Sequence, residues 1–598
     1  MAVSSRQFAV GSAGGNLAYK PKNTGYVLKR LWGYLKRHIW WLLLAFALTV
    51  SANLFGLAGP YLSGKAVNAM DCGPGQVDFD GIFYYAKMLL LFYAASSLFS
   101  YILTRLMQFI TKRIVREMRN DVFDKLMTLP VSYFDRNQTG DIISRISYDI
   151  DVVNTSLSSD LITILASLIT VIGSFIMMVI ISPVMVLVLL VTIPMSIFYT
   201  GYMSKRIRPL FRVRSAKLGA LNGFAEETIG GQKTIRAYAV EDKILDRFDA
   251  VNDDAIDAYY KAEHASCIVG PTINFINNIS LALVAVFGAV LRITRGMSLN
   301  AISSFVLYSK KFSGPINETA NIISELQSAL AAAERVFKVL DESEETADVE
   351  GAKELTDTNG KVDLDDVTFA YTEGKNVLKN VSFTAEPGSM TAIVGETGSG
   401  KTTIINLLMR FYDPQTGEIR IDGTEHREFT RESLRKSYTM VLQDTWLFGG
   451  TVFENIAYGK PDATREEVIN AAKAAKIHSF IMRLPQGYDT VINEDGSNIS
   501  KGQKQLLTIA RAMLLDAKML ILDEATSNVD TRTEMQIQSA MRKLMNEKTC
   551  FVIAHRLSTV KNADKILLID RGVVKESGTH RELLAKRGAY WQLYTAQE

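Results

Sequence analysis

The sequence contains few cysteines. Three occur in 598 residues, at Cys72, Cys267 and Cys550, and no two of them form a CxxC pair. A disulfide framework or a cysteine-ligated metal site needs closely and regularly spaced cysteines. The spacing therefore argues against both, and it is typical of a chain whose thiols meet a reducing cytoplasm.

The net charge is also small. The formal net charge is +3 over 598 residues, whereas a nucleic-acid-binding chain usually carries a clustered basic face, so we expect no nucleic-acid partner. Hydrophobic residues make up 48% of the chain and charged residues 22%, with a mean hydropathy of +0.09. This composition is too apolar for an ordinary soluble protein and too charged for one buried wholly in a membrane. Because domains usually run to roughly 100 to 200 residues, we expect a chain of several domains.

Charged residues are missing from long stretches of the N-terminal half. Residues 39–62, 161–203 and 267–291 contain none, and apolar runs above about 18 residues are typical of membrane-spanning helices. Residues 161–203 are long enough for two spans, with a break at Ser182 and Pro183. These runs therefore predict four spans, two of them joined in a helical hairpin.

Two further spans are predicted on weaker grounds. Residues 82–104 contain one lysine, near the start of the run, where its side chain can reach the interface. Residues 299–324 contain three charged residues, Lys310, Lys311 and Glu318. We include this segment partly because an even number of spans returns the chain to its starting side. Charges inside a span are costly toward lipid, so we expect these three to face a cavity, pair, or lie near the cytoplasmic mouth.

Acidic residues are absent from residues 1–38, which carry several lysines and arginines. The segments between spans two and three and between spans four and five are also rich in basic residues, whereas the opposite loops hold only Lys65, Arg292 and Arg295. Positively charged loops stay in the cytoplasm. We therefore expect a multi-pass protein of the plasma membrane, the inner membrane in a bacterium, with both termini cytoplasmic. The first run begins too late and is too long for a secretory signal, and an organellar targeting peptide stays a minor alternative.

The two inward segments between spans are long, about 55 and 60 residues, and show helical periodicity. We expect them to be helices that extend into the cytoplasm. Each contains a polar, glycine-bearing stretch, at residues 133–141 and 226–235. Taken alone, both stretches are typical of solvated turns.

The composition changes after Leu340, where the acidic residues 341–345 precede alternating strand and helix patterns. An apolar run, Met390–Val394, leads into a GxxxxGK[ST] loop, and a helical pattern follows at residues 403–410. Strand, loop and helix form the context in which such a loop binds phosphate, with Lys401 on the phosphates and Thr402 offering its hydroxyl to Mg²⁺. The predicted ATP-binding residues here are Gly395, Glu396, Thr397, Gly398, Ser399, Gly400, Lys401, Thr402 and Thr403.

A second apolar run, at residues 519–524, ends in two carboxylates, Asp523 and Glu524. This pattern is typical of a buried parallel strand that places acids at its carboxyl end. We expect Asp523 to hold Mg²⁺ and Glu524 to act as the general base on the attacking water. The alternative is that either acid caps the next helix.

Residues 498–503 precede a long amphipathic helix at 504–515. Ser500 and Gln503 have the spacing of a capping box. A helix start bearing Ser500 and Gly502 is also suited to an anion, so the structural and the functional interpretations are compatible.

The order of these motifs resembles the ATPase domain of ABC transporters, whose signature is usually LSGGQ. The motifs are the phosphate loop, Gln443, residues 499–503, residues 522–524, residues 527–530 and His555. The resemblance covers nearly the whole chain, since the N-terminal half is similar to the six-helix exporter arrangement. It implies an α-helical six-span transmembrane domain followed by an α/β P-loop ATPase domain, with coupling helices at the two polar stretches. The expected domains are a cytoplasmic segment (1–38), the membrane domain (39–337), a linker (338–360) and the ATPase domain (361–598).

The resemblance also implies roles for single residues. Tyr371 would stack on adenine, Gln443 would contact Mg²⁺ and the membrane helices, and His555 would contact the γ-phosphate. Ser500, Gly502, Gln503 and Asp530 would bind the nucleotide. A packed, structural Tyr371 stays an alternative, since it follows Phe369 in an alternating pattern.

Two motifs depart from the family pattern. Ile499 and Lys501 stand where Leu and Gly are common, and residues 527–530 read SNVD where SALD is common. In such ATPases each nucleotide lies between the P-loop of one domain and the signature of the other. An altered signature with an intact Glu524 resembles the catalytically intact subunit of heterodimeric bacterial multidrug exporters. We therefore hypothesise a heterodimer with a second half-transporter, with a homodimer as the alternative.

The resulting function is ATP-dependent export of small, amphipathic or hydrophobic molecules such as drugs, lipids or peptides, by alternating access. An importer on the exporter scaffold and an ATP-gated channel or regulator are the alternatives. A soluble ABC ATPase is disfavoured by the fused spans. A leader-cleaving peptide exporter is disfavoured because the first span begins near residue 39.

Overall fold

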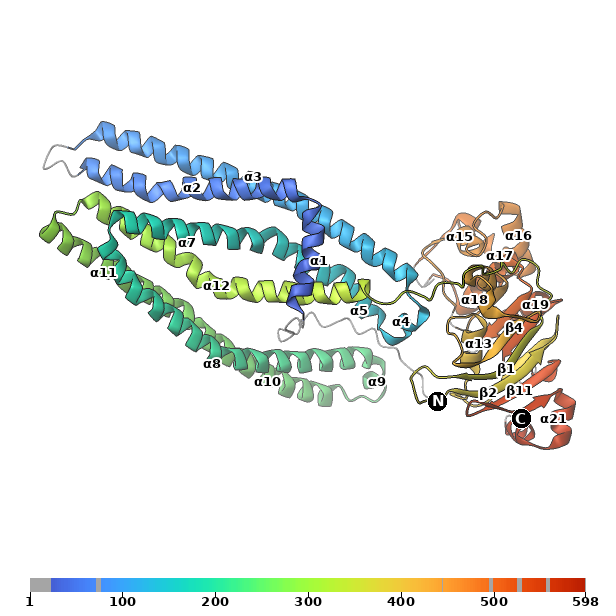
Figure 1. Ribbon diagram of the computed structural model, residues 1–598. Coiled ribbons are helices and arrows are strands. Elements are labelled where there is room, and N and C mark those ends of the chain that lie inside the picture. Colours follow the sequence, from blue (N-terminus) through green and yellow to red (C-terminus); the bar gives the residue numbers. More distant parts are fainter. Residues whose placement is uncertain are drawn as a thin grey trace. The chain divides into compact units, whose positions relative to one another are not determined.

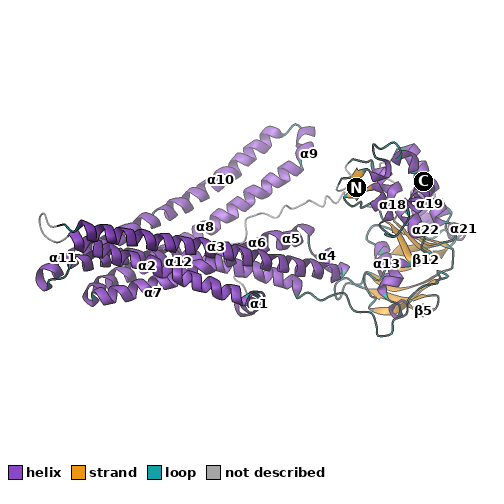
Figure 2. Cartoon of the chain, turned by 90° about the horizontal axis from the view of Figure 1, so that it is seen from above, coloured by secondary structure: helices purple, strands orange, loops and turns teal. Residues whose placement is uncertain are grey.

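The structure is a computed structural model that describes residues 23–70, 77–443, 445–493, 498–523, 530–554 and 560–596. Within it, the side chains of residues 316–321, 323 and 324 are not described. The chain forms two compact units, one of residues 1–129 and 133–344 and one of residues 130–132 and 345–598. The first unit is helical, and the second contains sheets (Figures 1 and 2).

The predicted spans are helical, and residues 267–291 begin at the last residue of one helix and continue in the next. A polar N-cap and a proline make the predicted hairpin: Ser182 Oγ accepts a hydrogen bond from Met185 N at 3.4 Å, and Pro183 occupies the first turn of the next helix. The helices and π-helical turns are α1 (Thr24–Lys36), α2 (Ile39–Met70), α3 (Phe79–Thr128), α4 (Val131–Arg136), α5 (Thr139–Ser144), η1 (Arg145–Asp149), α6 (Ile150–Thr155), η2 (Ser156–Asp160), α7 (Leu161–Ile181), α8 (Pro183–Gly230), α9 (Gln232–Ala237), α10 (Glu241–Cys267), α11 (Val269–Arg295) and α12 (Leu299–Leu340).

Five helical stretches in the described part of the chain are long and apolar enough to cross a membrane: Ile39–Met70, Phe79–Thr128, Thr139–Ile181, Pro183–Gly230 and Glu241–Arg295. The sixth predicted span begins α12, a continuous helix of 42 residues. This helix, which contains Lys310, Lys311 and Glu318, is not among the five. The membrane-spanning helical class is therefore confirmed, and the sixth span stays a prediction.

The long segments between spans two and three and between spans four and five are helical, as predicted. Helices α8 and α10 run side by side, with the short α9 at their far end (Figures 1 and 2). The second polar stretch thus forms the end of α8 and the start of α9, while the first overlaps α4 and the start of α5.

The second unit has a six-stranded sheet of order β12-β11-β3-β10-β9-β6 and a four-stranded antiparallel sheet of order β2-β1-β4-β5. Strands β3, β6, β9, β10 and β11 are parallel to their neighbours, and β12 closes one edge antiparallel. The strands are β1 (Val362–Phe369), β2 (Leu378–Ala385), β3 (Met390–Val394), β4 (Thr416–Ile421), β5 (Thr424–Glu425), β6 (Tyr438–Val441), β9 (Met519–Asp523), β10 (Thr549–Ile553), β11 (Lys565–Asp570) and β12 (Val573–Gly578), with a separate pair β7 (Gly450–Thr451) and β8 (Val491–Ile492).

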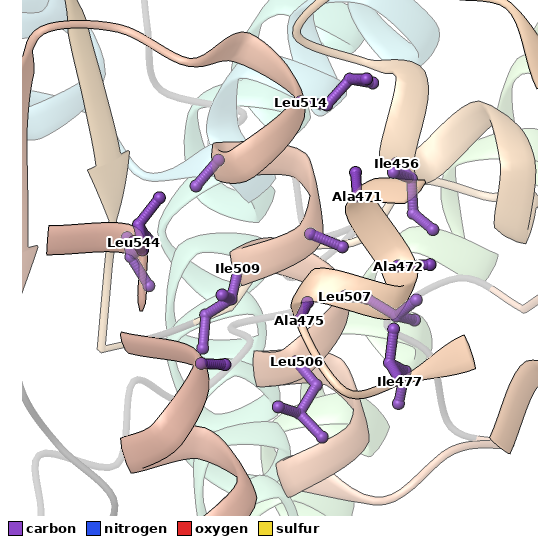
Figure 3. Packing of buried hydrophobic residues seen from close by; sticks show 14 of the residues in the cluster. Ile456, Ala471, Ala472, Ala475, Ile477, Leu506, Leu507, Ile509, Leu514 and Leu544 are labelled. Atoms are coloured by element: carbon purple, nitrogen blue, oxygen red, sulfur yellow. The ribbon is translucent and has the colours of Figure 1, made fainter. Parts of the chain in front are cut away.

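The helices of this unit pack on the sheets and on one another. They are α13 (Lys401–Leu408), η3 (His426–Glu428), α14 (Arg431–Lys436), α15 (Val452–Ala457), α16 (Arg465–Ala474), α17 (His478–Ile481), η4 (Gly487–Asp489), α18 (Lys501–Leu515), α19 (Thr531–Met545), α21 (His580–Lys586) and α22 (Ala589–Thr595). Leu506, Leu507 and Ile509 of α18 are buried in one core with residues of α15, α16 and α19 (Figure 3). This packing fixes the direction of α18, whose first turn carries the predicted signature.

Three arginines hold the acidic linker against the ATPase unit. Arg435 pairs with Glu345 at 2.5 Å, and Arg431 and Arg410 pair with Asp348 at 3.0 and 3.5 Å. Arg410 and Arg431 are nearly buried, so removing an acid would leave a desolvated charge. The change of composition is visible in the sequence, whereas these ion pairs were not predicted.

Candidate functional site

Three motifs lie at the ends of parallel strands of one sheet. The predicted phosphate loop follows β3, Gln443 follows β6, and Asp523 is the last residue of β9. Because β3, β10, β9 and β6 pair in parallel, their carboxyl ends lie at one edge of the sheet. Crevices at this edge are where open α/β sheets bind ligands. The fold thus brings the P-loop, Asp523 and Gln443 to a common edge.

The P-loop backbone depends on its glycines. Gly398 has φ +84° and Gly400 has φ +109°, both in the region where residues with a Cβ are strained. Gly395 lies so close to the next strand that an added Cβ would collide with the carbonyl oxygen of Ile569. The loop ends directly in α13, which begins at Lys401, two residues before the predicted helix. A glycine loop entering a helix start exposes backbone N–H groups suited to an anion.

Lys401 is held inside the loop. Its Nζ donates hydrogen bonds to the carbonyl oxygens of Gly395 and Glu396, both at 2.8 Å. The side chain is nearly buried, and this burial lowers the pKa of Lys401, while the charge of Asp523 acts in the opposite direction. An ammonium has three N–H donors, so one is left for a ligand. A desolvated cation with a spare donor fits a phosphate group.

The side chain of Ser399 is a second indication that the loop binds phosphate. Its Oγ is buried without a hydrogen-bond partner among the described residues. A buried hydroxyl without a partner is costly, and a phosphate oxygen at the loop would relieve it. The remaining loop residues Glu396, Thr397 and Gly398 are exposed, and the hydroxyl-bearing Thr403 is buried in the first turn of α13. The residues present therefore fit a nucleotide phosphate.

The predicted Mg²⁺ ligands are an exposed threonine, a half-buried carboxylate and an exposed amide. Thr402 is exposed in the first turn of α13, Asp523 is half-buried at the end of β9, and Gln443 is exposed two residues beyond β6. Hydroxyl, carboxylate and amide oxygens suit Mg²⁺. The donor set thus fits the metal.

Tyr371 lies two residues beyond β1, which ends at Phe369. Its ring meets those of Phe369 and Tyr412 edge-on, with centroids 4.9 and 5.0 Å away. Its hydroxyl donates to Thr403 Oγ1 at 3.2 Å and accepts from Asn406 Nδ2 at 3.1 Å. These contacts tie the ring to α13, and 38% of the residue stays exposed. The contacts of Tyr412 and Asn406 with Tyr371 were not predicted, because only the fold brings these residues together.

The predicted signature forms the start of α18. Ser500 Oγ accepts from Gln503 N at 3.3 Å, and Ser500 N donates to Gln503 Oε1 at 2.9 Å, so the predicted capping box is present. Gly502 is buried, and Ser500 and Lys501 are exposed. Within the described residues no hydrogen bond joins residues 499–503 to the P-loop.

Asp530 is the N-cap of α19. Its carboxylate accepts a hydrogen bond from Thr533 N at 2.9 Å, and this bond lowers the pKa of Asp530. The capping role was not predicted for this residue. Glu524, His555 and residues 527–529 lie outside the described residues, as does Cys72.

A membrane-spanning helical unit and a P-loop ATPase unit in one chain define an ATP-driven membrane transporter. Residues 42–316 match the ABC transporter transmembrane region, and residues 378–527 match the ABC transporter ATPase family. The chain belongs to the ABC transporter family.

Two relatives and one solved structure support this assignment. The chain is 44% identical over 531 residues to the fatty acid ABC transporter ATP-binding/permease protein of Mycobacterium bovis, covering 89% of this chain and 84% of the relative. It is 37% identical over 574 residues to the ATP-dependent lipid A-core flippase of Haemophilus ducreyi, covering 95% and 97%. A bacterial Atm1-family ABC exporter solved with ATP bound matches with a TM-score of 0.74 and 29% identity, covering 96% of this chain and 99% of that one.

These findings confirm the predicted family and class of activity. The chain is a multi-pass membrane protein that binds ATP and couples its hydrolysis to transport, and ABC exporters of this kind work as dimers.

Proposed function

We propose that this chain is one half of an ATP-driven exporter of small amphipathic or hydrophobic molecules, in a cytoplasmic membrane with both termini inside. The observation that carries the proposal is the length of α8, which has 48 residues. At about 1.5 Å per residue such a helix measures roughly 70 Å, more than twice the roughly 30 Å of a bilayer core. Helix α8 therefore extends far beyond the bilayer and ends at α9.

The proposed transmission is mechanical. Two ATP molecules draw two ATPase domains together, the short helices α4 and α9 receive the motion, and the long helices carry it to the membrane spans. Hydrolysis then resets the inward-facing state. The assigned boundaries are a cytoplasmic segment (1–38), a membrane domain (39–337), a linker (338–360) and an ATPase domain (361–598).

The proposed nucleotide roles combine the positions described above with the resemblance to ABC ATPase domains. The P-loop and Lys401 hold the phosphates, Tyr371 offers its ring to adenine, and Thr402, Asp523 and Gln443 hold Mg²⁺. When bound, Mg²⁺ neutralises charge on the phosphates. Glu524 acts as the general base and His555 contacts the γ-phosphate. Ser500, Gly502, Gln503 and Asp530 serve the nucleotide of the partner chain, and among the described residues no hydrogen bond joins the signature to this chain's P-loop.

The proposed substrate class and the proposed direction of transport are based on the relatives named above. One relative is named for a fatty acid and the other for lipid A-core, and both of these molecules are amphipathic. ATP-dependent accumulation of a fluorescent amphiphile in inside-out vesicles tests export. Accumulation that needs ATP and stops with Lys401→Ala supports it. Loss of a preloaded amphiphile from the same vesicles on ATP addition identifies an importer, and equilibration without accumulation identifies a gated channel.

The partner is proposed to be a second, different half-transporter, because Ile499 and Lys501 alter the signature that serves the opposite site. Expressing this chain alone and together with its genomic neighbour tests the assignment. A heterodimer needs both chains for substrate-stimulated ATP hydrolysis. Full stimulated activity of the purified single chain means a homodimer.

A further inference from the structure

A lysine lies deep within the proposed sixth span. Lys311 is the thirteenth residue of α12, which begins at Leu299. Twelve residue steps measure about 18 Å along a helix, so the ammonium lies well inside a bilayer core of about 30 Å. A charge at this depth is rare and is usually functional.

The contact that holds Lys311 follows from a proline in the facing helix. A carbonyl in an α-helix normally accepts from the N–H four residues later. In α2 the residue four after Gly56 is Pro60, which has no N–H, so the Gly56 carbonyl loses that partner. Lys311 Nζ donates to this carbonyl oxygen. One turn away, Tyr308 OH donates to Leu57 O at 2.6 Å, so α12 is fastened to α2 beside the proline.

This contact does not balance the charge. Of the three N–H groups of Lys311, one has a partner among the described residues, and no described carboxylate lies within 4.0 Å of it. The adjacent Lys310 is exposed and also has no described acidic partner. Glu318 is seven residues further along α12, roughly 10 Å along the axis, and its side chain is outside the description. Two positive charges therefore lie side by side within the span.

The surroundings are polar on one side and apolar on the other. Ser96 Oγ and Lys311 Nζ each lie 3.6 Å from the place that a Cβ on Gly56 would take, and the Ser96 hydroxyl donates to Ala52 O at 2.8 Å. The next residue, Phe312, is buried, and its ring lies 6.2 Å from the ring of Phe175 on α7, which is 42% exposed. A cation without a described counter-charge, with exposed apolar surface near it, suits a molecule with an anionic head and a hydrocarbon tail.

We propose that Lys311, with the exposed Lys310, binds the anionic headgroup of an amphiphilic substrate, a carboxylate, phosphate or sulfate on a hydrocarbon chain. The proposal rests on the proposed export function and specifies its substrate. The carbonyl freed by Pro60 holds the Lys311 ammonium in place between substrates, and a bound anion supplies the missing counter-charge.

The test compares three probes with the same tail. The purified transporter, with its partner chain if one is needed, is placed in neutral phosphatidylcholine vesicles at pH 8. Its ATPase rate is followed against oleate, oleyl alcohol and oleylamine, and each rate is divided by the same variant's rate without probe. Oleate should stimulate and the other two should not. Acetate should not stimulate, because it has the anion without the tail.

The Lys311→Met variant should raise the oleate concentration for half-maximal stimulation about tenfold or more, the size expected for losing a charged hydrogen bond. Lys311→Arg should restore most of the stimulation. Lys112→Met, which removes an exposed lysine from the cytoplasmic part of α3, is the matched control and should respond like the wild type.

A second variant separates ligand binding from a merely structural role. Replacing Pro60 with alanine supplies the N–H that Gly56 O lacks. Pro60→Ala combined with Lys311→Met should therefore regain thermal stability without regaining the response to oleate. If the double variant responds to oleate like the wild type, Lys311 serves only to satisfy the carbonyl and the proposal fails.

Equal stimulation of the wild type by oleate, oleyl alcohol and oleylamine would also overturn the headgroup site, yet it would leave an exporter of amphiphiles. A wild-type transporter that hydrolyses ATP but moves no amphiphile in the vesicle assay would instead overturn the proposed function. The two failures are therefore distinguishable.

Discussion

The guanidinium of Arg335 on α12 holds the buried carboxylate of Asp149 in the π-helical turn η1. Nε donates to Oδ2 at 2.9 Å and Nη2 donates to Oδ1 at 2.5 Å. The Asp149 side chain is 4% exposed and that of Arg335 is 38% exposed. One contact thus joins the C-terminal part of α12 to the segment that precedes α7.

Removing only one partner of this pair should destabilise the protein. Arg335→Met leaves a buried carboxylate without its main counter-charge, which costs several kcal/mol when both partners are buried. Because Arg335 is partly exposed, we expect about 2 kcal/mol and a lower unfolding temperature in detergent. Arg335→Met with Asp149→Asn should recover part of the loss. A double variant no more stable than the single one would contradict this account.

The P-loop glycines should differ in their tolerance of a side chain. At Gly398 a Cβ meets open space, so Gly398→Ala costs only the strain of a positive φ, about 1–2 kcal/mol. At Gly395 a Cβ also collides with Ile569 O. Gly395→Ala should therefore lower the unfolding temperature more, and it should abolish binding of a fluorescent ATP analogue. Equal effects of the two variants would mean that the loop conformation differs from the one described.

Tyr371 should contribute to ATP binding through its ring. Stacking of a base on an aromatic side chain contributes about 1–3 kcal/mol, so Tyr371→Ala should raise the Kd for ATP about tenfold. Tyr371→Phe keeps the ring and loses the hydrogen bonds with Thr403 and Asn406. It should bind ATP within about twofold of the wild type. An unchanged Kd in Tyr371→Ala would make Tyr371 a packing residue of the aromatic cluster.

His426 should make the stability of the ATPase unit depend on pH. Its side chain is buried, with Nδ1 3.1 Å from Ile419 O, and burial lowers the pKa of His426 to about 4. The unfolded chain takes up the proton near pH 6.5 and the folded chain only near pH 4. As the pH is lowered from 6.5 to 4, the free energy of unfolding should therefore decrease by roughly 3 kcal/mol in total. Above pH 6.5 His426 should no longer make the stability depend on pH.

Thermal unfolding of the full-length protein at pH 7 and pH 5 tests this dependence. His426→Gln removes the titrating group and should reduce the difference between the two unfolding temperatures. The same difference in the variant and the wild type would show that other groups cause the acid sensitivity.

Local patterns predicted much of this structure. The apolar run at Met390–Val394 is β3 with the same bounds, and the spacing of Ser500 and Gln503 gives the capping box found at α18. The break at Ser182 and Pro183 separates α7 from α8. In each case the physical cause acts within a few residues, so the sequence carries it.

Long-range pairs were not predictable in the same way. Arg335 and Asp149 are 186 positions apart, and Lys311 and Gly56 are 255 apart. Nothing near either residue in sequence indicates its partner, because packing of separate helices brings them together. The contacts of Tyr412 and Asn406 with Tyr371 were missed for the same reason.

The measurement that tests the central claim most directly is ATP hydrolysis by the purified transporter in vesicles, with Glu524 intact and as glutamine. Lys401→Ala, which removes the ammonium inside the P-loop, is measured beside it. The account predicts near-complete loss of hydrolysis in both variants, with ATP binding retained in Glu524→Gln and lost in Lys401→Ala. Hydrolysis that survives Glu524→Gln would contradict the account, because another group would then be the general base.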